Sequence, residues 1–305
     1  MHPDDNDRSD APGAAQTSDE AGADPAAGGS SKLDEIIATR RAKVAELRAA
    51  GVEPYPVRFA PTSTLAELRA RYPDLDPQTD TGDAATVAGR IVSIRRLGKL
   101  TFVVLREDGM DLQLFCPRAA LDEASRALIG LLDVGDWLGA DGEVVATKTG
   151  ELSVKPATLT MLSKGLRPLP DKWHGLSDTE ARFRQRELDL VVNADARRVF
   201  ELRSRVLKAL RVELDERGYV EVETPMLHPI PGGATARPFV THHNALDADL
   251  YLRIAPELYL KRLIAGGMRR VYEINRSFRN EGMSTRHNPE FTMLESYEAY
   301  ADYHD

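Results

Sequence analysis

The stretch FRNEGMSTRHNPEF, residues 278–291, decides how the chain folds around its most charged segment. It concentrates arginine, glutamate and histidine side chains, and only Gly282 and Pro289 are placed to bend the backbone. The segments on either side, VYEINRSF (271–278) and EFTMLESY (290–297), have the alternation of polar and apolar residues that β-strands show. We therefore expect two antiparallel strands joined by a bent loop.

Strand alternation also assigns a face to the functional side chains of this hairpin. Antiparallel pairing would place Arg279 and Glu281 beside Phe291 and Glu295. A guanidinium group, an aromatic ring and carboxylates would then share one pocket. From spacing alone, the alternative is a solvated hairpin whose surface ion pairs contribute little to stability.

The composition is that of an ordinary globular chain. It has 305 residues, of which 42% are hydrophobic and 29% charged, and this length suggests about two domains. The formal charge is −8, so any nucleic-acid contact must use local positive charge. No apolar run is long enough for a membrane span or a signal peptide. The single cysteine, Cys116, excludes an internal disulfide, and we expect a cytoplasmic protein without membrane contact.

The order of patterns along the chain predicts four regions. Residues 1–31 lack large apolar side chains after Met1 and are expected to form a disordered tail. Residues 32–165 contain two helical patterns, followed by strand, strand, strand, helix, strand and strand, an order compatible with a five-stranded oligonucleotide-binding barrel. Residues 166–180 form a proline-punctuated linker, and residues 181–305 form a second domain.

Three local expectations concern single elements. PRAALDEASRALIGLL, residues 117–132, predicts a helix with a proline at its start. Apolar residues from Val199 to Leu214 recur at helical spacing and predict a long helix closed by Gly218. YVEVETPML, residues 219–227, predicts a strand that follows this helix.

Three long segments together resemble class II lysyl-tRNA synthetases. FRNEGMSTRHNPEFTMLESYEAYADY (278–303) is similar to the second class motif of that family, and RGYVEVETPML (217–227) to the first. IPGGATARPFVTHHNALDADLYLRIAPELYLKRL (230–263) resembles the stretch between them. The resemblance runs from about Leu33 to Asp305. It implies an α+β fold, in which an N-terminal OB-fold barrel precedes a partial antiparallel catalytic sheet with flanking helices.

The resemblance implies a lysine–tRNA ligase, which activates L-lysine with ATP and Mg²⁺ and transfers it to tRNA(Lys). Such catalysis needs positioning and charge stabilisation, not a protein nucleophile. Arg279, the catalytic residue, is expected to clamp the α-phosphate and the attacking carboxylate, because its planar fork suits both. Glu281 would accept a hydrogen bond from the adenine amino group, and Phe291 would stack on the adenine. His287 and Asn288 would approach the phosphates, although a simple turn role stays open for His287.

The same resemblance assigns a lysine pocket. Lysine carries two ammonium groups, and the family positions that receive it correspond here to Gly233, Glu257, Glu295 and Tyr297. The two glutamates would supply negative charge at two places, and Gly233 would let the backbone approach the substrate closely.

The barrel is expected to bind the anticodon, which needs an aromatic ring for stacking and polar groups for base edges. The family's anticodon-reading positions correspond to Arg95, Phe102, Gln113 and Glu151. Spacing leaves open whether Arg95 or Arg96 is the contacting arginine, and Lys99 adds local positive charge. For Phe102, an ordinary place in the barrel core is the alternative.

The family continues beyond the last residue of this chain, Asp305, to a third class motif with carboxylates for Mg²⁺. We therefore expect no metal ligands in this fragment, and no lysine activation by it alone. The family's first motif builds a homodimer interface, so a homodimer is expected. The His242–His243 pair is a weak zinc candidate, because adjacent strand residues face opposite ways and no cysteine or spaced histidine supports it.

Three alternatives remain at this point. One is a non-catalytic OB-fold RNA-binding protein with a vestigial synthetase domain. Another is a synthetase-like ligase that modifies a translation factor, although such ligases lack the barrel. Aspartyl and asparaginyl synthetases share the architecture, but IPGGATARPF and APELYLKR fit the lysine enzymes better. The helix at 33–50 could contact RNA or a second subunit, or simply pack.

Overall fold

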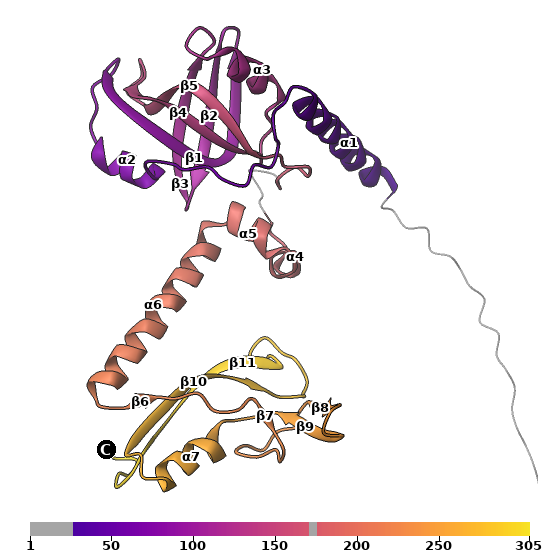
Figure 1. Ribbon diagram of the computed structural model, residues 1–305, viewed down its shortest axis with the longest axis vertical. Helices are drawn as coiled ribbons and strands as arrows, with labels where there is room; N and C mark the ends of the chain where they lie inside the picture. Colours follow the sequence, from indigo (N-terminus) through magenta and orange to yellow (C-terminus); the bar gives the residue numbers. More distant parts are fainter. Residues whose placement is uncertain (1–26, 171–175) are drawn as a thin grey trace, which may run out of the picture. The chain divides into compact units, whose positions relative to one another are not determined.

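The computed structural model describes residues 27–170 and 176–305, with side chains from residue 32 onward. The chain divides into two compact units, and the division falls between Val192 and Asn193. Most of the predicted tail lies outside the described residues, but the first helix already begins at Ala27, within the range predicted as tail. The expected α+β fold, a barrel followed by a small sheet with flanking helices, is confirmed (Figure 1).

The first unit is built around a five-stranded barrel. Its elements are, in chain order, α1 (Ala27–Ala49), α2 (Leu65–Arg71), β1 (Asp80–Leu97), β2 (Leu100–Glu107), β3 (Met110–Pro117), α3 (Glu123–Leu131), β4 (Trp137–Ala146), β5 (Leu152–Ser163), α4 (Thr179–Arg184) and α5 (Arg186–Val192). The barrel closes in the order β1-β2-β3-β5-β4, and β3 and β5 run parallel where the others run antiparallel. Figure 1 shows these strands curling around one interior.

Alternation along the strands builds the barrel core. On β2, Val103 and Leu105 are fully buried, whereas Phe102 faces the other side and is half-buried. Leu65 and Leu68 of α2 join the same core cluster. A capping box stands at the start of α2, because the Thr64 side chain accepts from the Glu67 backbone and the Glu67 carboxylate accepts from the Thr64 N–H.

The predicted helix start at Pro117 is wrong. Pro117 is the last residue of β3, where it pairs with Leu100, and α3 begins six residues later at Glu123. The physical reason is the capping residue: the Asp122 carboxylate accepts a hydrogen bond from the Ser125 N–H at 2.7 Å.

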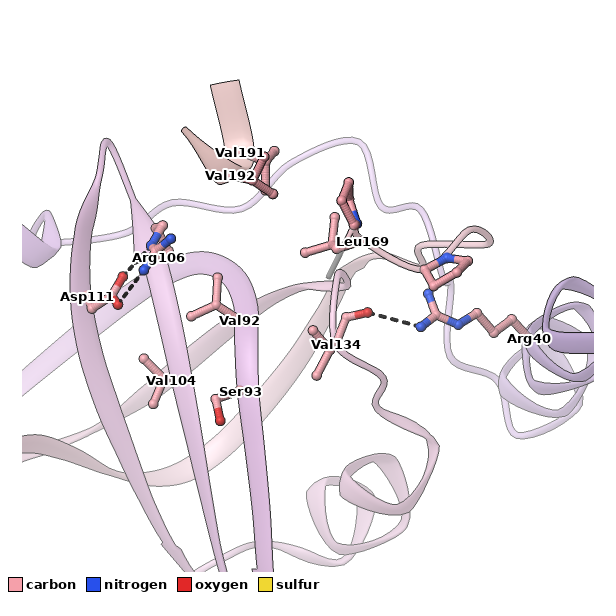
Figure 2. Close-up of a pocket in the computed structure, with 12 residues that line it drawn as sticks. Arg40, Val92, Ser93, Val104, Arg106, Asp111, Val134, Leu169, Val191 and Val192 are labelled. Atoms are coloured by element: carbon pink, nitrogen blue, oxygen red, sulfur yellow. Dashed lines mark hydrogen bonds and ion pairs between the residues drawn. The ribbon is translucent and has the colours of Figure 1, made fainter. Parts of the chain in front are cut away.

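Buried charges join α1 to the end of β5. Arg40 donates to the carbonyl oxygens of Val134, Gly165 and Arg167 at 2.8–3.1 Å. Lys164, 2% exposed, is ion-paired with Asp133 and Asp136. Figure 2 shows Arg40 reaching Val134 at the edge of a pocket of about 560 Å³ beside the barrel.

The second unit contains the charged hairpin. Its elements are α6 (Ala194–Glu216), β6 (Val220–Glu221), β7 (Leu227–His228), β8 (Val240–His243), β9 (Ala248–Leu252), α7 (Glu257–Ala265), β10 (Arg270–Phe278) and β11 (Glu290–Glu298). The strands form two three-stranded sheets, ordered β11-β10-β6 and β7-β9-β8. In Figure 1, α7 lies alongside the β10–β11 hairpin.

The long helix predicted between Val199 and Leu214 is present as α6, and Gly218 follows it with a φ of +77°. The strand predicted over 219–227 is much shorter, since only Val220 and Glu221 pair in parallel with β10. Beyond them the chain leaves the sheet, and Pro225 has no N–H with which to continue a ladder.

Candidate active site

The strands β10 and β11 form the predicted antiparallel pair, in unbroken register from Arg270↔Glu298 to Phe278↔Glu290. The pairing continues one step into the loop, where the Arg279 N–H donates to the Pro289 carbonyl at 2.8 Å. At the tip, the Ser284 hydroxyl contacts His287 Nδ1 at 2.8 Å. The loop is therefore ordered by its own short-range hydrogen bonds.

All the residues predicted to bind ATP line one cavity of about 260 Å³. The lining residues are Arg279, Glu281, Gly282, Arg286, His287, Asn288 and Phe291. The Arg279 guanidinium carbon lies 5.1 Å from the centre of the Phe291 ring, within cation–π range. Arg279 Nε is buried and has no hydrogen-bond partner among the described residues. A cavity with two arginines, an aromatic ring and an acceptor carboxylate suits an anionic ligand with a planar heterocycle.

The residues predicted to bind lysine also come together. Gly233 has a φ of +90°, and a β-carbon there would lie 3.0 Å from the Glu257 side chain at the start of α7. On β11, the Tyr297 hydroxyl donates to Glu295 at 3.0 Å. Burial raises the pKa of Glu295, the Tyr297 hydrogen bond opposes this, and the nearby charge of Glu257 raises that pKa further. The Glu257 and Glu295 carboxylates are therefore close enough to repel each other, and both residues are half-buried.

The prediction that Glu295 shares one pocket with Arg279, Glu281 and Phe291 is wrong. Glu281 lines the loop cavity, whereas Glu295 pairs in register with Glu273, four residues along the strand from Phe291. At about 3.3 Å per residue, Phe291 and Glu295 are roughly 13 Å apart. One face of the hairpin thus carries the loop cavity at one end and the Glu295 carboxylate further along the strand, rather than one common pocket.

In the barrel, three of the four predicted anticodon residues are in contact. Arg95 lies opposite Phe102 in the β1–β2 register, with its guanidinium carbon 5.2 Å from the ring centre. Arg95 also donates to Gln113 at 3.3 Å. Arg96 instead donates to the carbonyls of Ile129 and Leu132 at the end of α3, so Arg95 is the arginine beside Phe102.

The fourth residue, Glu151, lies in the turn before β5. Its carboxylate is paired with Arg69 of α2 at 3.0 Å. Its carbonyl accepts from Ser153, which in turn accepts from the buried Gln113 side chain. The Phe102 ring lies 5.7 Å from Phe115, outside the barrel core. The barrel therefore offers an outward aromatic side chain, Phe102 beside Arg95, of the type that single-stranded nucleic acids stack on.

Comparison with known families agrees with both halves of this geometry. The family described as tRNA synthetases class II (D, K and N) matches residues 178–305, which include the hairpin and both carboxylate positions. The family described as OB-fold nucleic acid binding domain matches residues 85–162, the barrel. The chain therefore carries a class II tRNA synthetase domain that follows an OB-fold domain.

Among curated relatives, the chain is similar to lysine–tRNA ligases. That of Magnetococcus marinus is 55% identical over 274 residues, which are 89% of this chain and 55% of the relative. That of Xanthomonas oryzae pv. oryzae is 54% identical over 277 residues, with 89% and 54% covered. That of Pelotomaculum thermopropionicum is 52% identical over 280 residues, with 92% and 54% covered. The chain spans about half the length of these relatives.

Sequence reasoning missed one ion pair of the synthetase domain. Arg253 and Glu273 are 1% and 4% exposed, and their side chains are 2.6 Å apart. The available signal was Arg253 itself, a charged residue within the apolar run LYLRIAP. Its partner lies 20 residues further on, and nothing local in the sequence connects the two.

The His242–His243 pair lies on β8. His242 contacts Asp249 at 3.0 Å, and the His243 ring accepts from the Leu246 N–H at 3.3 Å. Within residues 27–170 and 176–305, no group of three histidine, cysteine or acidic side chains is placed to hold a metal ion. In the same ranges, no helix is long and apolar enough to cross a membrane.

Proposed function

We propose that the function of this protein is that of a lysine–tRNA ligase. Such an enzyme forms lysyl-adenylate from L-lysine and ATP and transfers the lysyl group to tRNA(Lys). The observation that carries the proposal is the pair of neighbouring carboxylates, Glu257 of α7 and Glu295 of β11. Glu295 lies on the hairpin face that begins at Arg279. Lysine is the amino acid that brings two ammonium groups to such a pair. The similarity to lysine–tRNA ligases supports the same choice.

ATP would occupy the loop cavity. Phe291 would stack on the adenine, and Glu281 would accept a hydrogen bond from its amino group. The buried Nε of Arg279 has an unused donor, which suits an oxyanion of the α-phosphate or of the attacking carboxylate. His287 and Asn288, on the wall of the same cavity, would contact the other phosphates. The chain thus lowers the barrier by holding two anions in line against fixed positive charge.

Lysine would lie with its ammonium groups at Glu257 and Glu295. Gly233 keeps the space in front of Glu257 clear, because any side chain there would meet Glu257 and Ala255. Tyr297 holds the Glu295 carboxylate from the side and completes the end of the site. A neutral or acidic amino acid would leave a carboxylate without its partner, and this supplies discrimination.

Mg²⁺ belongs to this proposal as the counter-ion of ATP. Among the described residues, no group of three histidine, cysteine or acidic side chains is placed to hold a metal ion. Such ions usually take their ligands from one or two carboxylates together with the substrate phosphates. The ion would supply additional charge neutralisation on the phosphates.

The barrel would bind the anticodon of tRNA(Lys). Arg95 and Phe102 offer a cation and a stacking face, and Gln113 and Glu151 offer polar groups for base edges. Against the −8 charge of the whole chain, such a contact depends on the local positive charge of Arg95. We place the anticodon-binding region at about residues 32–165 and the catalytic region at 181–305, in a cytoplasmic protein.

A homodimer is proposed from the exposed apolar side of α6. Val199, Val206 and Leu210 recur on one helix face and are all exposed, and Val220 of β6 is exposed as well. Contiguous exposed apolar side chains mark an interaction surface. Sedimentation velocity tests this: replacement of Val199 and Val206 by lysine should convert a dimer to a monomer, and an unchanged sedimentation coefficient would contradict it.

The function is tested by ATP–pyrophosphate exchange in the full-length protein, with each of several amino acids in turn. We expect exchange with lysine and not with aspartate or asparagine, the other substrates that the family description includes. Exchange that depends on aspartate or asparagine would refute the lysine assignment. Tight tRNA binding without exchange for any amino acid would instead favour a non-catalytic RNA-binding protein.

A further inference from the structure

Arg253 is a fully buried arginine that joins three segments behind the proposed lysine site. It lies between β9 and α7, and its Nε donates to the Arg276 carbonyl at 2.7 Å. Its Nη1 donates to the backbone and the hydroxyl oxygens of Thr224, each at 3.1 Å, and to Glu273 at 2.6 Å. The second Glu273 oxygen accepts from the Thr224 hydroxyl at 2.6 Å. Nearly all the hydrogen-bonding groups of the Arg253–Glu273 pair therefore have partners inside the protein.

Glu273 stands directly opposite Glu295 in the β10–β11 register. After burial and the Tyr297 hydrogen bond, the charges of Glu257 and Glu273 raise the pKa of Glu295, and the charge of Arg253 lowers it. Glu257, Glu273 and Arg253 thus all act on Glu295, and the formal charges of these four groups sum to −2. That sum equals the opposite of the two ammonium charges of lysine.

Two other ionisable groups near these carboxylates, His228 and Lys261, are not counted in this sum. His228 is buried against Tyr259, and burial lowers its pKa, so the ring is neutral at pH 7. Lys261 is paired with Glu257 at 2.5 Å, but its side chain is 59% exposed. Exposed pairs of this kind are weak because water screens them. Lys261 can therefore release Glu257 to an incoming ammonium group.

We propose that Arg253 sets the charge of the amino-acid site: by neutralising Glu273, it leaves Glu257 and Glu295 as the two uncompensated carboxylates that select a dication. This inference rests on the proposed lysine–tRNA ligase function. Arg253 is a positioning and specificity-determining residue, since it acts on the substrate through the glutamates. A buried ion pair adds little stability relative to apolar residues of similar size, so a role in charge selection accounts for its presence better than a role as a strut.

The test uses a double-mutant cycle in the full-length protein. Glu273→Gln changes the sum to −1, and Arg253→Met changes it to −3 and leaves Glu273 unpaired beside Glu295. We expect each single variant to raise the KM for lysine about tenfold or more, with the KM for ATP within about twofold of wild type. The double variant restores −2, and we expect its lysine KM within about threefold of wild type.

The controls separate charge from folding. Glu213→Gln with Arg217→Met removes an exposed arginine–glutamate pair on α6 and should leave both KM values unchanged. Arg253→Lys keeps the positive charge without the planar fork, and it should retain a lysine KM within about fivefold of wild type. This variant serves the test if Arg253→Met lowers the melting temperature too far for kinetic assays.

Two results would overturn the proposal. One is a folded double variant that is no better than either single variant, which is the behaviour of a strut. The other is an equal rise in the KM values for lysine and ATP. Absence of lysine-dependent exchange in the wild-type protein would refute the proposed function itself, and is thereby distinguished from failure of the charge-setting role.

Discussion

Replacement of Glu295 by glutamine removes one of the two carboxylates proposed to hold lysine, with almost no change in shape. The Tyr297 hydroxyl, 3.0 Å from Glu295, can still donate to the amide oxygen. Breaking a buried ion pair costs about 3–5 kcal/mol, and the lower end applies because Glu295 is only half-buried. About 3 kcal/mol corresponds to roughly a hundredfold loss of lysine affinity.

The assay is lysine-dependent ATP–pyrophosphate exchange in the full-length protein, with the KM for ATP as the internal reference. We expect the lysine KM to rise about a hundredfold and the ATP KM to stay within about twofold, since Glu295 lies outside the loop cavity. Glu213→Gln, the same change at an exposed site on α6, should have no effect. Near-normal lysine dependence in Glu295→Gln would refute the reasoning.

The same variant has a pH-dependent effect on stability. The pKa of Glu295 is raised above the ordinary value of 4.5, chiefly by burial, so the folded state favours the protonated form. The wild type therefore loses stability as the pH rises from about 4.5 through the raised pKa, and glutamine does not titrate. Thermal unfolding should show Glu295→Gln to be more stable than wild type at pH 7, by a margin that shrinks towards pH 4.5. A margin independent of pH would contradict the titration argument.

Three further predictions concern single side chains. Phe291→Ala should raise the KM for ATP about tenfold, because one aromatic stacking contact is worth about 1–3 kcal/mol, and an unchanged ATP KM would exclude stacking on this ring. Phe102→Ala should weaken tRNA binding by a similar factor in a filter-binding assay, with lysine-dependent exchange, which needs no tRNA, as the check on folding. Burial raises the pKa of the Cys116 thiol to about 12, so iodoacetamide at pH 8 should label Cys116 only after denaturation; rapid labelling of the native chain would be inconsistent with this burial.

Much of the fold follows from local pattern. Alternation from Leu100 to Glu107 and the glycine turns predict the barrel strands correctly, because a strand that closes a core must alternate. The start of α3 was missed because proline is favoured in the first turn of a helix, so Pro117 pointed to a helix start. Here pairing with Leu100 keeps Pro117 in the strand, and Asp122 supplies the cap.

The candidate site was predictable to a different degree. Arg279 and Phe291 lie on one loop and strand, so strand pairing alone brings them together. Gly233 and Glu257 were assigned only through family resemblance, since the contact between them joins separate turns of the chain. The Arg253–Glu273 pair was not predicted, because the burial that makes it important exists only after three segments have packed.

The pairing between β3 and β5 is the shortest in the barrel. Only two register pairs, Gln113↔Ser153 and Leu114↔Val154, join β3 to β5, and the Gln113 amide bridges this seam to the Ser153 hydroxyl at 3.0 Å. A nucleotide bound by Gln113, as proposed for the anticodon, would therefore contact the barrel at its shortest strand pairing. If the proposed anticodon contact forms, opening of the β3–β5 pairing and release of the RNA would be coupled, and bound RNA would stabilise this part of the barrel.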